Sequence, residues 1–241
     1  MKNLILFGLF VFLLVAIQFA GGKSVDEIIE KYIRTSGGEA NAAAIQSMYM
    51  EGLIIMMGMT AGIKISKIKD DLNPSGFNML WLLTGDEGVD TTAVNLLNDP
   101  VWVSNLMAEN QEVPNIGVHL YNYNTKGSAA VLIGKQTIED NSCYHVKLIT
   151  KEQTEIHYWI SSTSFLLQQS CVLNKSWKID TGGNNYFSYD NYRSIEGIMI
   201  AQSMRIEKRK GHQNSHCEIV FNKILINQPV ESIEAKPTSH S

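Results

Sequence analysis

The sequence predicts a mainly β (α+β) fold in which a large, strongly curved antiparallel sheet carries a few packed helices. In most segments after Met48, apolar and polar residues alternate with a period of two. This pattern is typical of strands with one buried face. Short connections between successive segments favour antiparallel pairing. A single amphipathic helical stripe precedes the strands, and such a stripe usually covers a core.

Residues 1–22 are predicted to be a cleaved secretory signal peptide. Lys2 gives the positive start, residues 4–17 form an apolar run, and the small residues at 20–22 offer a cleavage point. The alternative is an uncleaved membrane anchor, because the apolar run is rather long. Without a linker or repeat in the rest of the chain, we expect residues 23–241 to form one domain.

Composition and charge narrow the function classes. The net charge of −4 is mildly acidic, which argues against nucleic acid or anionic membranes as partners. Cys143, Cys171 and Cys217 are too few and too scattered for a disulfide framework. Two of them could pair in an oxidising compartment, and the sequence does not say which two.

The first helix is predicted to begin at Ser24, which forms a capping box with Glu27. Gly37 and Gly38 are expected to end it, and residues 39–47 read as a second short helix. A further helix is expected within residues 100–110. The helical stripe consists of Val25, Ile28, Ile29, Tyr32 and Ile33.

Roughly ten strands are predicted. The segments are 48–57, 61–69, 77–84, 88–96, 129–137, 142–150, 154–160, 164–173, 184–193, 197–210 and 216–226. An antiparallel sheet of this size curls, so its apolar residues would line a concave inner face. At this strand number the fold would keep a cavity, as barrels that hold one small ligand do.

The stretch "GLIIMMGMTAGIKI", residues 52–65, is apolar on both faces of its predicted strands. An apolar strand face exposed to water is an aggregation liability, so both faces need cover. We expect the N-terminal helix to cover one face while the other looks into the cavity. Methionine suits such a wall because it adapts to different apolar shapes. The alternative is that the stretch is solid core.

The predicted cavity wall follows the alternating apolar residues across the sheet. On the first strand the choice of face rests on alternation alone, because both faces are apolar. The expected lining residues are Leu53, Ile55, Met57, Ile63, Trp81, Tyr144, Val146, Leu148, Ile156, Tyr158, Ile160, Ile198, Ile200 and Met204.

Six segments follow one another along the chain, namely "VDEIIEKYIRTSGGEANAAAIQSM", "MEGLIIMMGM", "TKGSAAVLIGKQTIEDNSCYHVKL", "HYWISSTSFLLQQS", "YDNYRSIEGIMIAQSMRI" and "NQP". Their order and spacing resemble those of the LolA-like outer-membrane lipoprotein-sorting proteins, in a divergent periplasmic form. The resemblance covers roughly residues 24–228. Lys67 and Lys69 are the basic residues in a segment where relatives often carry one, and Asn78 stands where an arginine is usual.

The resemblance implies a half-open, LolA/LolB-like barrel with helices as a lid and an apolar cavity for acyl chains, without catalysis or cofactor. We therefore expect a periplasmic carrier that binds lipoprotein acyl chains or another apolar lipid, acts as a monomer and does not bind nucleic acid. The alternative is an envelope sensor that detects lipids or lipoproteins and signals to a membrane protein partner.

Some residues of the sequence are candidates for a metal site or an active site. His212, His216 and Cys217 are candidate zinc ligands, but on a strand His216 and Cys217 would point to opposite faces. The acidic residues of 85–92 do not have EF-hand spacing, and no GxSxG motif is present. His145 and His157 are expected as neighbours on a wet outer face. The sequence therefore predicts neither a metal site nor an active site.

Overall fold

The structure, a computed structural model, describes residues 23–56, 58–69, 77–84, 119–173, 184–210 and 213–228. These residues form two helices, α2 (Val25–Thr35) and α3 (Glu39–Ala43), and ten strands. The strands are β1 (Ser47–Met56), β2 (Met59–Lys69), β3 (Phe77–Thr84), β4 (Ala129–Ile138), β5 (Asn141–Ile149), β6 (Glu155–Ser161), β7 (Leu167–Leu173), β8 (Asn184–Ile195), β9 (Ile198–Lys210) and β10 (Gln213–Ile226).

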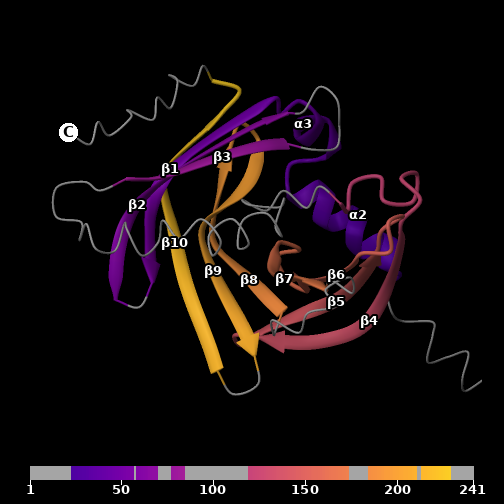
Figure 1. The fold of residues 1–241 in the computed structure, drawn as a ribbon. Helices are drawn as coiled ribbons and strands as arrows, with labels where there is room; N and C mark the ends of the chain where they lie inside the picture. Colours follow the sequence, from indigo (N-terminus) through magenta and orange to yellow (C-terminus); the bar gives the residue numbers. More distant parts are fainter. Residues whose placement is uncertain are drawn as a thin grey trace, which may run out of the picture.

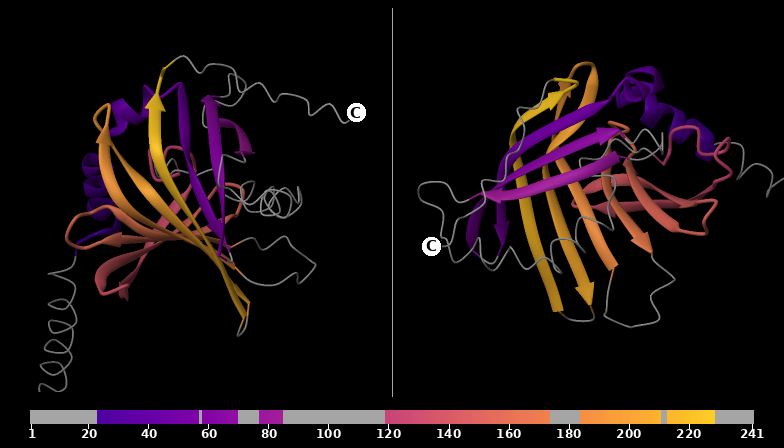
Figure 2. Two further views of the ribbon diagram at one scale, coloured as in Figure 1. Left: turned by 90° about the vertical axis from the view of Figure 1, so that its left-hand side faces the viewer. Right: turned by 45° about the horizontal axis from the view of Figure 1, so that its top comes forward.

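All ten strands belong to one sheet, in the order β3-β2-β1-β10-β9-β8-β7-β6-β5-β4. Every neighbouring pair is antiparallel. The first strand pairs with the last, which leaves β3 and β4 as the two edges (Figure 1). The sheet bends strongly and stays open between these edges (Figure 2). The predicted curved antiparallel sheet and half-open barrel are confirmed.

Helix α2 begins where the capping box predicts. The Ser24 hydroxyl accepts a hydrogen bond from the Glu27 backbone N–H (3.2 Å), and the Glu27 carboxylate accepts one from the Ser24 N–H (3.0 Å). Gly37 follows the helix with φ of 115°, a conformation that glycine adopts without strain. The short helix α3 is also confirmed. The predicted helix within 100–110 and strand at 88–96 lie outside the described residues.

The close approach of β1 to β10 explains why residue 52 of the apolar first strand is a glycine. The pairing of β1 with β10 shifts between Glu51 and Gly52, as at a β-bulge. A Cβ at position 52 would lie 2.0 Å from the Val220 carbonyl oxygen and 2.8 Å from the Phe221 Cα. Only glycine lets the two backbones approach this closely.

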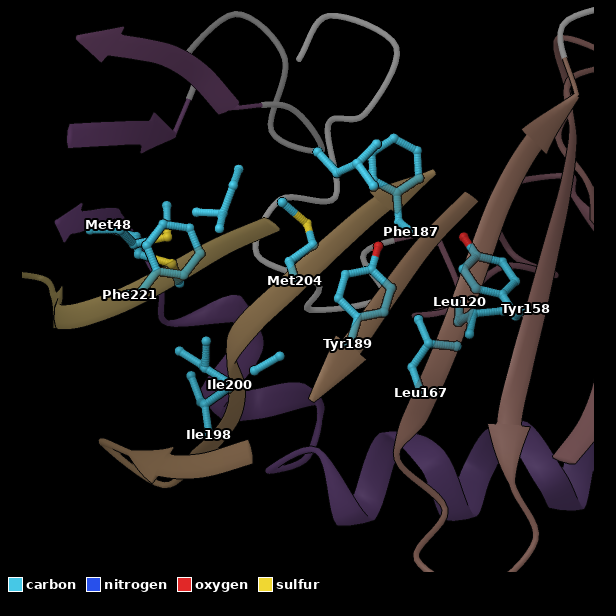
Figure 3. Packing of buried hydrophobic residues seen from close by; sticks show 14 of the residues in the cluster. Met48, Leu120, Tyr158, Leu167, Phe187, Tyr189, Ile198, Ile200, Met204 and Phe221 are labelled. Carbon is cyan, nitrogen blue, oxygen red and sulfur yellow. The ribbon is translucent and has the colours of Figure 1, made fainter. Parts of the chain in front are cut away.

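One sheet face, which we call the inner face, carries the main core. Side chains from β1, β2 and β5 to β10 pack there with Ile28, Ile29 and Tyr32 of α2 and with Leu120. Figure 3 shows part of this layer, with Met48 on β1, Met204 on β9, Tyr189 on β8 and Tyr158 on β6. The opposite side of the sheet is called the outer face below. No helix among the described residues is long and apolar enough to cross a membrane.

Candidate functional site

The inner face is a continuous apolar wall. Eight strands, from β2 at one end to β5 at the other, contribute buried hydrophobic side chains to it. Strands in a sheet lie about 4.8 Å apart, so the wall is about 34 Å wide. Partly buried Ala130 and Leu132 extend it onto the edge strand β4.

The structure brings together ten of the predicted lining residues on the inner face. Cross-strand pairs such as Leu148 with Ile156 and Val146 with Tyr158 show how register aligns them. All ten are at most 7% exposed. They are Ile63, Tyr144, Val146, Leu148, Ile156, Tyr158, Ile160, Ile198, Ile200 and Met204.

The predicted face of the first strand is wrong. Leu53 and Ile55 are 41% and 36% exposed and lie on the outer face, while Ile54 between them is fully buried in the inner-face core. Ile63 pairs with Gly52 rather than with Leu53 or Ile55, so it lies on the inner face. Alternation alone could not choose between two apolar faces.

Polar side chains lie on the outer face of the hairpin formed by β1 and β2. Lys64 forms an ion pair with Glu51 across the strands at 3.8 Å, and the Tyr49 hydroxyl donates to Glu51 at 3.1 Å. The helix α2 and the apolar wall share the inner face, so the expectation that the helix covers one face and a cavity the other is also wrong. The side chains of Met57 and Trp81 lie outside the described residues.

Several inner-face residues were not among the predicted lining. Met48, Met50, Phe187, Tyr189 and Phe221 all belong to the core cluster. Their signal was the same alternation, in strand segments that the sequence did identify. Polar groups also lie on this face, and the hydroxyls of Ser170 and Tyr189 hydrogen-bond there at 2.9 Å. Lys67 of β2 pairs with Met48 of β1 and is only 3% exposed. No local sequence pattern predicts the burial of this lysine.

The outer face of β5, β6 and β7 is not the wet surface that the sequence suggested. Cys143, Trp159 and Cys171 form a second buried cluster there. His145 is 7% exposed and stacks on Trp159, with ring centroids 4.6 Å apart. The Trp159 indole N–H donates to the side-chain amide oxygen Oε1 of Gln136 at 2.7 Å. An alternating pattern of His, Trp and Cys therefore marks a covered face here.

Two histidines and a carboxylate form a hydrogen-bonded chain on this outer face. The His145 Nε2 lies 2.6 Å from the His157 Nδ1, and the His157 Nε2 lies 2.9 Å from a Glu155 carboxylate oxygen. The other ring nitrogen of His145, Nδ1, is buried without a hydrogen-bond partner. Burial, assisted by the neighbouring His157, lowers the pKa of His145. This arrangement favours the neutral form of His145.

The three cysteines are buried and form no disulfide. Burial raises the pKa of Cys143 to about 11 and that of Cys217 to about 12. Because the thiolate is the reactive form, these two thiols are inert near neutral pH. Cys217 packs in the inner-face core and the adjacent His216 is exposed, so the two residues point to opposite faces as predicted.

Metal ligands do not gather in the part of the chain that the structure describes. No group of three or more His, Cys, Asp or Glu side chains there could hold a metal ion. His212 and the acidic residues of 85–92 lie outside the described residues. The described surroundings of Cys217 are those of an apolar core residue rather than of a ligand.

No protein-family model matches the sequence, and no curated protein matches it either. Solved structures do. A DUF1329 family protein from Desulfovibrio piger is 11% identical, with 87% of this chain and 95% of that chain covered and a TM-score of 0.54. A domain assigned to outer membrane lipoprotein sorting from Vibrio parahaemolyticus is 9% identical, with coverages of 86% and 93% and a TM-score of 0.50.

A LolA superfamily protein from Nitrosomonas europaea is 11% identical, with coverages of 87% and 96% and a TM-score of 0.46. The similarity at these identities is one of fold. The chain shares its fold, an open antiparallel sheet with few helices, with the DUF1329 family protein and the lipoprotein-sorting domain.

Proposed function

We propose that this protein is a periplasmic carrier that holds lipoprotein acyl chains or another apolar lipid against its inner face, without catalysis. One observation carries the proposal, namely the largely apolar wall across eight strands of an open sheet. The fold shared with the Vibrio parahaemolyticus domain supports the class of function.

The apolar wall is wider across the strands than helix α2 is long. Helix α2 has 11 residues and is therefore about 16 Å long, against about 34 Å for the wall. Methionines contribute to the wall on β1 and β9, and their flexible side chains rearrange around apolar ligands of different shape. Ligand entry requires α2 to move, because its apolar residues pack in the same cluster.

The anchoring of α2 is uneven. At its C-terminal end, the Ser36 carbonyl accepts a backbone hydrogen bond from Met199 of β9 at 3.1 Å. At its N-terminal end, Asp26 accepts a hydrogen bond from the Tyr123 hydroxyl, and both residues are partly accessible. The N-terminal end is therefore the end that opens under our proposal.

The energetics suit a carrier that must release its cargo. Burying a methylene contributes about 0.8 kcal/mol, so a fourteen-carbon chain gains about 11 kcal/mol when fully enclosed. Association costs several kcal/mol of lost freedom. With an association cost of at least about 4 kcal/mol, the balance is at most about 7 kcal/mol, a Kd on the order of 10 μM or weaker.

Thermal melting with added fatty acid tests the proposal. A ligand present at 100 times its Kd stabilises the fold by about 2.7 kcal/mol, which raises the Tm of a domain of this size by about 5 to 11 °C. The variant Ile55→Asn, on the exposed outer face, should keep this shift. Mass spectrometry of an organic extract from the native protein should identify the natural cargo. A folded protein whose Tm is unmoved by any acyl chain would refute the carrier.

A second function is favoured by the outer face of β1. Leu53 and Ile55 are exposed apolar side chains on a strand, which is typical of surfaces that contact another protein. We infer that an envelope sensor, signalling to a membrane protein, is the alternative. A pull-down from envelope extract distinguishes the two, since a carrier should recover lipoproteins and a sensor a membrane signalling protein.

A further inference from the structure

Two aromatic rings stack where α2 meets the β4 edge. Tyr144 of β5 lies on the inner face opposite Ile160, and Phe165 belongs to the turn between β6 and β7. Their ring centroids are 6.0 Å apart with an interplanar angle of 25°. Tyr144 belongs to the inner-face core, and Phe165 packs against it. The pair therefore forms one end of the apolar wall.

Three lysine ammonium groups converge on this aromatic pair. The Lys23 Nζ lies 4.4 Å from the Phe165 ring centroid and 5.7 Å from that of Tyr144. The Lys31 Nζ lies 5.1 Å from the Phe165 centroid, and the Lys135 Nζ lies 5.0 Å from that of Tyr144. We call these three residues the lysine cluster.

The lysines come from separate parts of the chain. Lys23 precedes α2, Lys31 lies within it, and Lys135 lies on β4. The pairing of β4 with β5 shifts between Leu132 and Gly134. This bulge turns Lys135 to the face that its partner Tyr144 occupies, whereas unbroken alternation from Leu132 would have placed Lys135 on the outer face.

The charge of the lysine cluster is poorly balanced by the described residues. No described carboxylate makes an ion pair with any of the three. The nearby acids of α2 have other partners, since Glu27 caps the helix and Glu30 pairs with Arg34. The ammonium group of Lys23 lies beside that of Lys31 and lowers the pKa of Lys31, while Glu27 acts weakly in the opposite direction.

We propose that the lysine cluster binds the anionic headgroup, a phosphate or carboxylate, of the lipid whose acyl chains lie on the inner face. The inference rests on the proposed carrier function and narrows its cargo to anionic lipids. An oxyanion among three ammonium groups would relieve their mutual repulsion, and the adjoining aromatic rings lead directly to the apolar wall. Lysine is a common phosphate ligand that acts as a point charge.

Lysolipids with one myristoyl chain and different headgroups test this inference. Binding of lysophosphatidylglycerol, lysophosphatidylcholine and inorganic phosphate to the native protein would be measured by calorimetry below the critical micelle concentration. Partly exposed charge pairs contribute up to about 1 kcal/mol each, so the anionic lysolipid should bind about tenfold more tightly than the zwitterionic one. This preference should shrink as salt rises.

Matched variants test whether the lysine cluster causes the preference for the anionic lysolipid. In the double variant Lys31→Gln with Lys135→Gln, where only Lys23 of the cluster remains, the preference should fall from tenfold to about twofold, with little change for the zwitterionic lysolipid. The control is Lys223→Gln, because the Lys223 ammonium also lies over a tyrosine ring, 5.6 Å from the Tyr49 centroid, but on the outer face. This control should keep the tenfold preference.

The outcomes separate the headgroup inference from the carrier function. Equal binding of both lysolipids by the native protein, or an unchanged preference in the double variant, would overturn the headgroup inference alone. Inorganic phosphate binding as tightly as the anionic lysolipid would assign the cluster to a free anion and also overturn it. Failure of both lysolipids to bind would overturn the carrier and the inference together.

Discussion

Ile54 and Ile55 are adjacent in β1 and lie on opposite faces of the sheet, which makes them a direct test of the inner wall. Ile54 is fully buried among the inner-face residues, and Ile55 is 36% exposed opposite Thr60 of β2. Replacing a buried isoleucine with alanine costs about 2 to 5 kcal/mol. We expect Ile54→Ala to fall in this range.

The Ile55→Ala variant supplies the matched control. It has the same loss of β propensity, which spans about 1 kcal/mol, but leaves no enclosed void. We therefore expect Ile55→Ala to lower the free energy of unfolding by about 1 kcal/mol or less, so that the two variants differ by at least about 1 kcal/mol. Urea unfolding of both variants and the parent, with a shared m-value, measures this difference.

The acyl-chain ligand sharpens the comparison. If the wall also contacts ligand, Ile54→Ala should weaken fatty-acid binding while Ile55→Ala leaves it unchanged. Equal unfolding free energies for the two variants would refute the assignment of faces on β1. A large stability loss in Ile54→Ala with unchanged fatty-acid affinity would instead show that this part of the wall is solid core.

Three further predictions follow from single residues. Gly52→Ala should destabilise the fold by on the order of 2 to 4 kcal/mol in urea unfolding, because its Cβ would meet the Val220 backbone at 2.0 Å; a loss below about 0.5 kcal/mol would contradict this contact. Ser24→Ala should cost about 1 kcal/mol through loss of the cap on α2, measured in the same way. Because burial lowers the folded-state pKa of His145 below its ordinary 6.5, the unfolded chain binds the proton first, so stability should fall as pH drops below about 6.5. The variant His145→Gln should reduce this slope between pH 7.5 and 5, and an unchanged slope would exclude His145 as its source.

Local signals in the sequence predict the elements of this fold well. The capping box at Ser24 and Glu27 fixes the start of α2 within one turn, and period-two alternation identifies the strands of the sheet. Their antiparallel order follows from short connections. The pairing of β1 with β10 does not follow from short connections, because it joins the first and the last strand of the sheet.

The candidate site is harder to predict because it depends on contacts between distant residues. On β1 both faces are apolar in the sequence, and the structure places Glu51 on the outer face, where it pairs with Lys64 of β2. The covered outer face at Trp159 depends on what packs over it, whereas its alternation alone resembles a solvated surface. The lysine cluster depends on a bulge in β4 that no residue pattern announces.

The position of the lysine cluster connects cargo recognition to the movement of α2. The helix is fastened at its C-terminal end by the backbone bond from Met199 to Ser36, while Lys23 precedes its first residue and Lys31 lies just past its midpoint. The Tyr123 side chain contacts the N-terminal end of the helix through Asp26. An anionic headgroup bound by the lysine cluster would draw Lys31 towards Lys135 on the β4 edge, and so would hold α2 over the acyl chains. Loss of the headgroup would remove this link between α2 and the β4 edge and favour release, which gives a single helix both the recognition of the cargo and the control of its exit.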